Sequence, residues 1–151
     1  MGMLLAAAIL TVLGWFLPLH NYITPRVGVG YWMGIVGASM MLLLLSYSLR
    51  KRFRFLDWSP TLNRWFNWHM FLGLFGPILI LYHCGYRLGA DNSNMALWSM
   101  ITVAVSGVIG RYLHNREQFK RLFGIWHVAH LPFVFVLIIT AIIHILAVNL
   151  Y

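Results

Sequence analysis

Five long apolar runs make up most of this chain and limit it to folds that a lipid bilayer can hold. The runs cover residues 3–19, 27–49, 65–85, 95–113 and about 125–148. A helix needs about 20 largely apolar residues to cross a bilayer. Only 9% of the 151 residues are charged, whereas an average soluble domain has about 25%. The sequence therefore predicts an all-α membrane protein, a bundle of about five transmembrane helices that forms a single domain over residues 1–151.

The first run has the length of a signal peptide, but its sequence argues against cleavage. It lacks a basic start, and no small-residue cleavage site follows it. We therefore expect a retained helix over residues 3–19.

The basic residues lie in the short loops between the apolar runs, so the net charge of +8 needs no nucleic-acid partner. Nine of them are in the second and fourth loops: Arg50, Lys51, Arg52, Arg54, Arg64, Arg111, Arg116, Lys120 and Arg121. The other two loops hold only Arg26 and Arg87. Because cytoplasmic loops are enriched in Lys and Arg, we expect an integral protein of a bacterial cytoplasmic (inner) membrane, with its N-terminus in the cytoplasm and its C-terminus outside. The third and fifth helices then run parallel.

Four histidines form two pairs with the same spacing on the third and fifth runs. His69 and His83 are 14 positions apart, and so are His130 and His144. At 3.6 residues per turn this is close to four full turns, so each pair shares a helix face, with about 21 Å between its members. On parallel helices, His69 and His130 come at one depth near the inner surface, and His83 and His144 at another near the outer surface.

Imidazole suits both axial positions of a haem iron, so the four histidines are candidate metal ligands. They predict two bis-histidine b haems, stacked across the membrane between the third and fifth helices. The haems would be held noncovalently, because the chain has no Cys-x-x-Cys-His motif, and its single cysteine, Cys84, excludes an internal disulfide.

Two alternatives use these histidines without haem. An intramembrane histidine can bridge helices through a hydrogen bond, and a set of them can relay protons or ions in a transporter or channel. A membrane oxygenase would gather many histidines at one surface, whereas these are split between two depths. The matched pairs favour haem.

His127 precedes His130 by three positions and complicates the inner pair. Its spacing of 17 to His144 turns it roughly a quarter turn off the shared face. We expect it to bond a haem propionate, or to be the inner ligand if Pro132 distorts the helix start. His20 and His114 lie in or beside loops and are interpreted as surface residues.

Gly73 and Gly76 fall between His69 and His83, where a flat macrocycle must approach the backbone closely. Close packing between membrane helices explains these glycines equally well.

Four arginines are candidate partners of the anionic haem propionates. Arg64, Arg111 and Arg121 are expected on the inner side and Arg87 on the outer side. Their simpler role is to set the membrane topology.

One motif resembles a known family. The segment His69-Met-Phe-Leu-Gly73-Leu-Phe-Gly76-Pro-Ile-Leu-Ile-Leu-Tyr-His83, followed by Trp126-His127-x-x-His130 and by His144, resembles the ferric reductase-like transmembrane domain. The resemblance covers the third to fifth helices, about half of the chain, and that family includes the membrane part of NADPH oxidases. It implies two b haems held by two histidine pairs on parallel helices. The cytochrome b of quinol-oxidising complexes has comparable spacing, so spacing alone does not choose the family.

Unlike those oxidases and reductases, this sequence carries no flavin or nicotinamide domain. Its glycines at positions 28, 30 and 34 open a membrane helix and do not follow a strand, so they are not a dinucleotide fingerprint. Electrons are therefore expected from a flavin, iron-sulfur or multihaem partner subunit, or from a diffusible carrier such as a quinone, whose site the sequence does not locate. With no nucleophile or acid–base pair evident, we expect an electron-transfer subunit of an oxidoreductase complex more than an enzyme acting alone.

Overall fold

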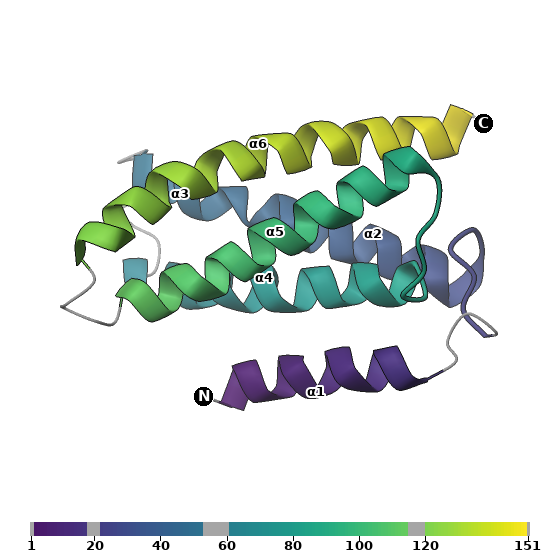
Figure 1. Ribbon diagram of the computed structural model, residues 1–151, viewed down its shortest axis with the longest axis horizontal. Coiled ribbons are helices and arrows are strands. Elements are labelled where there is room, and N and C mark those ends of the chain that lie inside the picture. Colours follow the sequence, from purple (N-terminus) through teal and green to yellow (C-terminus); the bar gives the residue numbers. More distant parts are fainter. Residues whose placement is uncertain (1, 18–21, 53–60, 115–119, 151) are drawn as a thin grey trace. The chain divides into compact units, whose positions relative to one another are not determined.

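The computed structural model describes residues 2–17, 22–52, 61–114 and 120–150 (Figure 1). Within these ranges the regular secondary structure is entirely helical, which confirms the all-α prediction. The helices are α1 (Gly2–Phe16), α2 (Gly28–Leu43), α3 (Leu45–Arg52), α4 (Leu62–His83), α5 (Asp91–His114) and α6 (Lys120–Leu150).

Four helical segments of the described chain are long and apolar enough to cross a membrane. They are Gly28–Arg52, which joins α2 and α3, Leu62–His83, Asp91–Arg111 and Val128–Leu150. Helix α1 is apolar but has 15 residues, so it is about 22 Å long and shorter than the roughly 30 Å hydrocarbon core. Four of the about five expected spans are therefore found by length and composition.

The apolar side chains of these helices point outward in large number. Leu5 is 64% exposed, Val128 72% and Leu150 73%. In water such a surface would be strongly unfavourable, whereas in lipid it is the ordinary exterior of a spanning helix. The helices are thus suited to a lipid bilayer, as the sequence predicted.

Most helix ends differ from the predicted runs by a few residues, and two differences change the interpretation. The second run was expected to be one helix, but it divides at Leu44 into α2 and α3. Pro132 does not mark a helix start, because α6 begins at Lys120 and continues through the proline. A proline inside a helix removes one backbone hydrogen bond, and in a membrane helix small local changes can satisfy the freed carbonyl. Helix α6 can therefore extend on the N-terminal side of Pro132.

The chain forms two compact units, Met1–Arg87 and Leu88–Tyr151, and each is described by itself. In unit 1, α2 and α4 pack against each other in antiparallel directions, and α1 packs against α4 (Figure 1). In unit 2, α5 and α6 pack as an antiparallel pair. The prediction of a single domain stays a prediction.

Glycines allow the close approach of α2 and α4 in unit 1. A Cβ added to Gly37 would lie 2.9 Å from Cδ1 of Ile80, and one added to Gly76 would lie 3.2 Å from Cγ of Met41. Small residues are the usual means of bringing membrane helices together. This fixes α2 and α4 in register, and with them the histidines of α4.

Helix α1 attaches to the C-terminal end of α4 through two tyrosines. The hydroxyl of Tyr82 donates to the carbonyl of Leu10 at 2.9 Å. Tyr86, which has a φ of 58°, packs its ring on Gly14, where a Cβ would overlap it. The left-handed turn at Gly85 and Tyr86 therefore directs this ring back onto α1.

Candidate functional site

His83 lies at the last residue of α4, and its ring rests on the backbone of α2. Its Nδ1 is 2.8 Å from the carbonyl oxygen of Gly30. A Cβ on Gly34 would come within 2.7 Å of the same nitrogen, so the ring fits only because position 34 has no side chain. A carbonyl can only accept, so Nδ1 carries the proton and Nε2 has the lone pair of the neutral ring.

His69 is bonded in the same way at the other level of unit 1. Its Nδ1 is 3.3 Å from the carbonyl oxygen of Leu44, the residue that divides α2 from α3. Around this residue the helix tightens: the amide of Leu44 donates to Met41 at 3.2 Å, and the amide of Tyr47 donates to Leu44 at 3.3 Å. These are bonds of the 3₁₀ type. The acceptor is again a carbonyl, so His69 also has its proton on Nδ1.

A cavity of about 340 Å³ adjoins His69 within unit 1. Three aromatic side chains line it, from Tyr47, Trp65 and Trp68, and Arg64 supplies a cation beside them. The ring centroids of Tyr47 and His69 are 5.1 Å apart. The remaining lining residues are Leu43, Ser46 and Leu72. Arg64, a predicted propionate partner, therefore lines the same cavity as the candidate ligand His69.

In unit 2, the histidine Nδ1 atoms contact the hydroxyls of two serines on α5, whereas in unit 1 they contact backbone carbonyls. Oγ of Ser93 is 3.0 Å from Nδ1 of His144, and Oγ of Ser106 is 2.7 Å from Nδ1 of His130. The hydroxyl of Ser106 donates its single proton to the carbonyl of Val103 at 2.8 Å. When the hydroxyl donates to Val103, its oxygen accepts from Nδ1–H of His130; in the other tautomer it donates to Nδ1.

Trp126 completes the surroundings of His130. The two rings stack with their centroids 5.0 Å apart and an interplanar angle of 28°. The indole Nε1–H donates to the carbonyl of Ser106 at 2.6 Å. The indole lies on Gly110, where a Cβ would overlap it. A hydrogen bond and a stacked ring together restrict the orientation of His130.

The register of each helix pair explains why all four histidines find a partner. Gly30 and Leu44 are 14 positions apart, like His69 and His83, and run in the opposite order on the antiparallel helix. Ser93 and Ser106, 13 apart, do the same for His144 and His130. Each unit therefore holds one histidine at each of two levels.

The other predicted site residues have less defined surroundings. Arg87 is exposed, directly after α4 and near His83, and Arg111 is partly buried in the last turn of α5. His127 belongs to α6, but its side chain lies outside the described residues, as do those of His114 and Arg121; His20 is outside them altogether. The two proposed roles of His127 thus stay predictions.

Gly73 and Gly76 both face α2. A Cβ on Gly73 would make only an ordinary contact with Cδ2 of Leu44 at 3.7 Å, whereas Gly76 lies close to Met41 and to the carbonyl of Gly37. Gly76 therefore serves the helix packing that the sequence left open as an alternative, and a role of either glycine beside a haem stays a prediction.

Cys84, next to His83, has the surroundings of a packing residue. Burial raises the pKa of its thiol, although nearby backbone hydrogen bonds work in the opposite direction. Its Sγ donates to the carbonyl of Leu81 at 3.2 Å. A protonated thiol is a poor nucleophile, which agrees with the interpretation of Cys84 as structural.

Sequence reasoning did not identify the hydrogen-bond partners of the histidines, which are Gly30, Leu44, Ser93 and Ser106. The serines carry little signal, because hydroxyls in membrane helices usually bond the preceding turn, as Ser99 does with Met95 at 2.7 Å. Their separation of 13 residues would have been informative only with the antiparallel pairing of α5 and α6 already known.

No group of three or more His, Cys, Asp or Glu side chains gathers as a metal site within the part of the chain that the structure describes. An axially ligated haem needs only two protein ligands.

Comparison with known proteins finds no family model, no curated protein and no solved structure that matches this chain. The resemblance to the ferric reductase-like transmembrane domain therefore rests on the histidine motif alone.

Proposed function

We propose that this chain is a di-haem cytochrome b subunit, which carries electrons across a membrane between a redox partner or quinone and an acceptor on the other side. One observation carries the proposal: each of the four matched histidines has its Nδ1 hydrogen-bonded to the neighbouring helix. Ligand histidines in metalloproteins typically donate their second ring nitrogen in this way, which fixes the tautomer and orients the ring.

The donor set suits b haem. In His69 and His83 the partner is a backbone carbonyl, which can only accept, so the proton lies on Nδ1 and Nε2 is the nitrogen able to coordinate a metal. Bound haem would supply one-electron exchange between ferric and ferrous iron. The protein would hold the iron through imidazole, and the surrounding apolar helices would keep water from the macrocycle.

The cavity beside His69 supports a role for Arg64. Its aromatic walls suit a planar apolar ring, and a guanidinium at its edge suits a carboxylate. We propose that Arg64 and Arg111 bind propionates on the inner side and that Arg87 binds one on the outer side.

In the proposed pairing, His69 and His130 ligate one haem, and His83 and His144 ligate the other. The equal spacing supports this assignment, because the two histidines on each helix are separated by the same distance, about 21 Å along the helix axis. The loop charges support a cytoplasmic N-terminus in a bacterial inner membrane. A flavin, iron-sulfur or multihaem subunit would supply or receive the electrons.

The test is a reduced-minus-oxidised absorption spectrum of the purified protein, with a pyridine haemochrome assay for haem per chain. We expect about two noncovalent b haems. Replacing His83 or His130 with alanine should lower this value, since each removes one axial ligand. His114→Ala, at a histidine without a matched partner, is the control. A protein that takes up no haem when haem supply is adequate would contradict the proposal, and would favour a proton or ion relay through the same histidines.

A further inference from the structure

We propose that Ser93 and Ser106 of α5 are positioning residues, which hold His144 and His130 with the proton on Nδ1 and thereby set the redox potentials of the haems that these histidines would ligate. The effect on potentials rests on the proposed function, whereas the effect on the histidine proton does not. Neither serine touches the iron in this proposal; each acts through its histidine.

The hydrogen bonds around Ser106 give it a defined direction. Its hydroxyl donates to Val103 at 2.8 Å, and its oxygen lies 2.7 Å from Nδ1 of His130. A serine hydroxyl has one proton and two lone pairs. In the proposed arrangement that proton stays on the bond within α5, and the histidine supplies the proton of the second bond.

Ser93 is arranged similarly with respect to His144. Its oxygen lies 3.0 Å from Nδ1 of His144 and 3.5 Å from Oδ1 of Asn92, which can only accept. The proposed arrangement has this oxygen accept from Nδ1–H of His144, while the 3.5 Å contact to Asn92 is too long to fix the direction of the hydroxyl by itself. Because the bond to Asn92 is long, we expect Ser93 to fix its histidine less firmly than Ser106 does.

The two units differ in whether this bond can be removed by mutation. In unit 1 the acceptors are the backbone carbonyls of Gly30 and Leu44, which no side-chain substitution deletes. In unit 2 the acceptors are hydroxyls. A hydrogen bond from Nδ1–H makes an imidazole ligand more basic, which favours ferric iron and lowers the potential. Removing a serine should therefore raise it.

The first experiment is a redox titration of the purified holoprotein, with wild type, Ser93→Ala, Ser106→Ala and Ser106→Thr compared. Each alanine variant should shift the midpoint potential of one haem upward, and the two variants should affect different haems. The threonine variant should restore the wild-type value, because it keeps the hydroxyl. Ser99→Ala is the matched control, since Ser99 bonds only its own helix among the described contacts. Potentials in both alanine variants equal to those of this control would overturn the inference.

The second experiment needs no haem, and a variant is used only to assign the signal. Histidine ¹⁵N NMR of the wild-type apoprotein in nanodiscs should show His130 protonated on Nδ1, with its signal assigned by His130→Gln. Protonation on Nε2 would overturn the inference. If the protein binds no haem but His130 is protonated on Nδ1, the proposed function fails while the role of Ser106 in holding the proton stands.

Discussion

At the scale of single residues, the histidines show how far spacing alone can lead. The 14-residue repeat identified four side chains, and the structure gives each of them a hydrogen-bond partner. The partners themselves were not predictable, because a backbone carbonyl such as that of Gly30 has no sequence signature, and a serine such as Ser106 resembles any other helical serine. Local sequence identifies the candidate ligands, whereas tertiary packing provides the hydrogen bonds that orient their rings.

Cys84 provides a residue-scale prediction about pH. Burial raises the pKa of its thiol, so less thiolate is present at a given pH, and thiolate is the reactive form. We expect maleimide to label Cys84 slowly at pH 8 and faster only as the pH rises beyond the ordinary range of a thiol. The rate is measured by mass spectrometry in detergent micelles.

The comparison is a single-cysteine variant, Cys84→Ser with Ser48→Cys, because Ser48 is exposed on α3. Equal labelling rates of the two cysteines at pH 8 would contradict the assignment of Cys84 as a half-buried, protonated thiol.

At the scale of helices, the lengths of the apolar runs predicted that helices form and roughly which residues they contain. They did not predict the residues at which each helix begins and ends. The division at Leu44 was missed because the surrounding residues are uniformly apolar and contain no proline or glycine at that point. The start of α6 was placed too late, since the residues from Lys120 are helical without being strongly apolar. Hydrogen bonds and packing determine these details, and hydropathy does not report them.

Packing between α2 and α4 predicts the effect of Gly34→Ala. The new methyl group would lie 2.7 Å from Nδ1 of His83, so the ring must move away from Gly30. Overpacking of this kind costs about 1–3 kcal/mol. We expect a lower thermal midpoint and a lower haem content, measured by scanning calorimetry and by pyridine haemochrome.

Gly107→Ala is the control for that variant, because a Cβ at Gly107 meets nothing within 4 Å. Alanine is favoured over glycine in a helix by about 1 kcal/mol, so this control should be as stable as the wild type or more so. If both variants keep full stability and haem content, His83 does not depend on the open space at Gly34.

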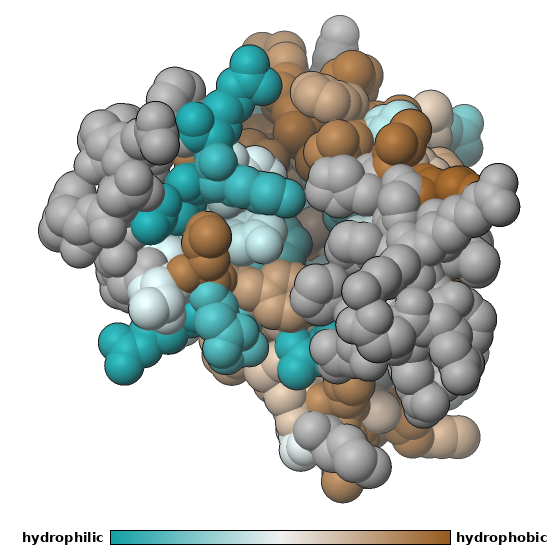
Figure 2. Space-filling model, turned by 90° about the vertical axis from the view of Figure 1, so that its left-hand side faces the viewer, coloured by the Kyte–Doolittle hydropathy of each residue, from teal (hydrophilic) through white to brown (hydrophobic). Residues whose placement is uncertain are grey.

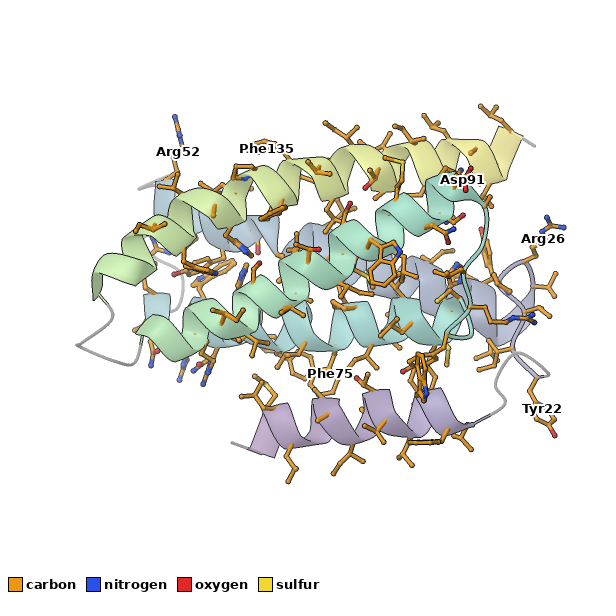
Figure 3. All side chains as sticks on the ribbon, in the orientation of Figure 1. Tyr22, Arg26, Arg52, Phe75, Asp91 and Phe135 are labelled. Atoms are coloured by element: carbon orange, nitrogen blue, oxygen red, sulfur yellow. The ribbon has the colours of Figure 1, made fainter. Side chains whose placement is uncertain are left out.

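At the scale of the whole molecule, the loop charges predict a membrane orientation. Arg26 and Arg52 lie at opposite ends of unit 1 (Figure 3). The last turn of α3 is basic, with Arg50, Lys51 and Arg52. Viewed from that end, the surface has a group of hydrophilic side chains with largely hydrophobic surface beside it (Figure 2). This is expected where a spanning helix leaves the lipid.

We expect Arg52→Cys and Arg26→Cys, each combined with Cys84→Ser, to react with a membrane-impermeant maleimide from opposite sides. In intact cells only the Arg26→Cys variant should be labelled, and in inverted membrane vesicles only the Arg52→Cys variant. Both arginines are exposed, so access does not limit either reaction. Labelling of both cysteines from the same side would contradict the predicted topology.

The unequal partners of the histidines have a genetic consequence. No loss of a side chain removes the main-chain carbonyls that accept from His83 and His69, although a Cβ on Gly30 or Gly34 would overlap neighbouring atoms and so disturb the first of these bonds. Ser93 and Ser106 can be lost through a single amino-acid change. The hydrogen bonds of His144 and His130 are therefore the ones that a point mutation removes directly, and such mutations fall on α5.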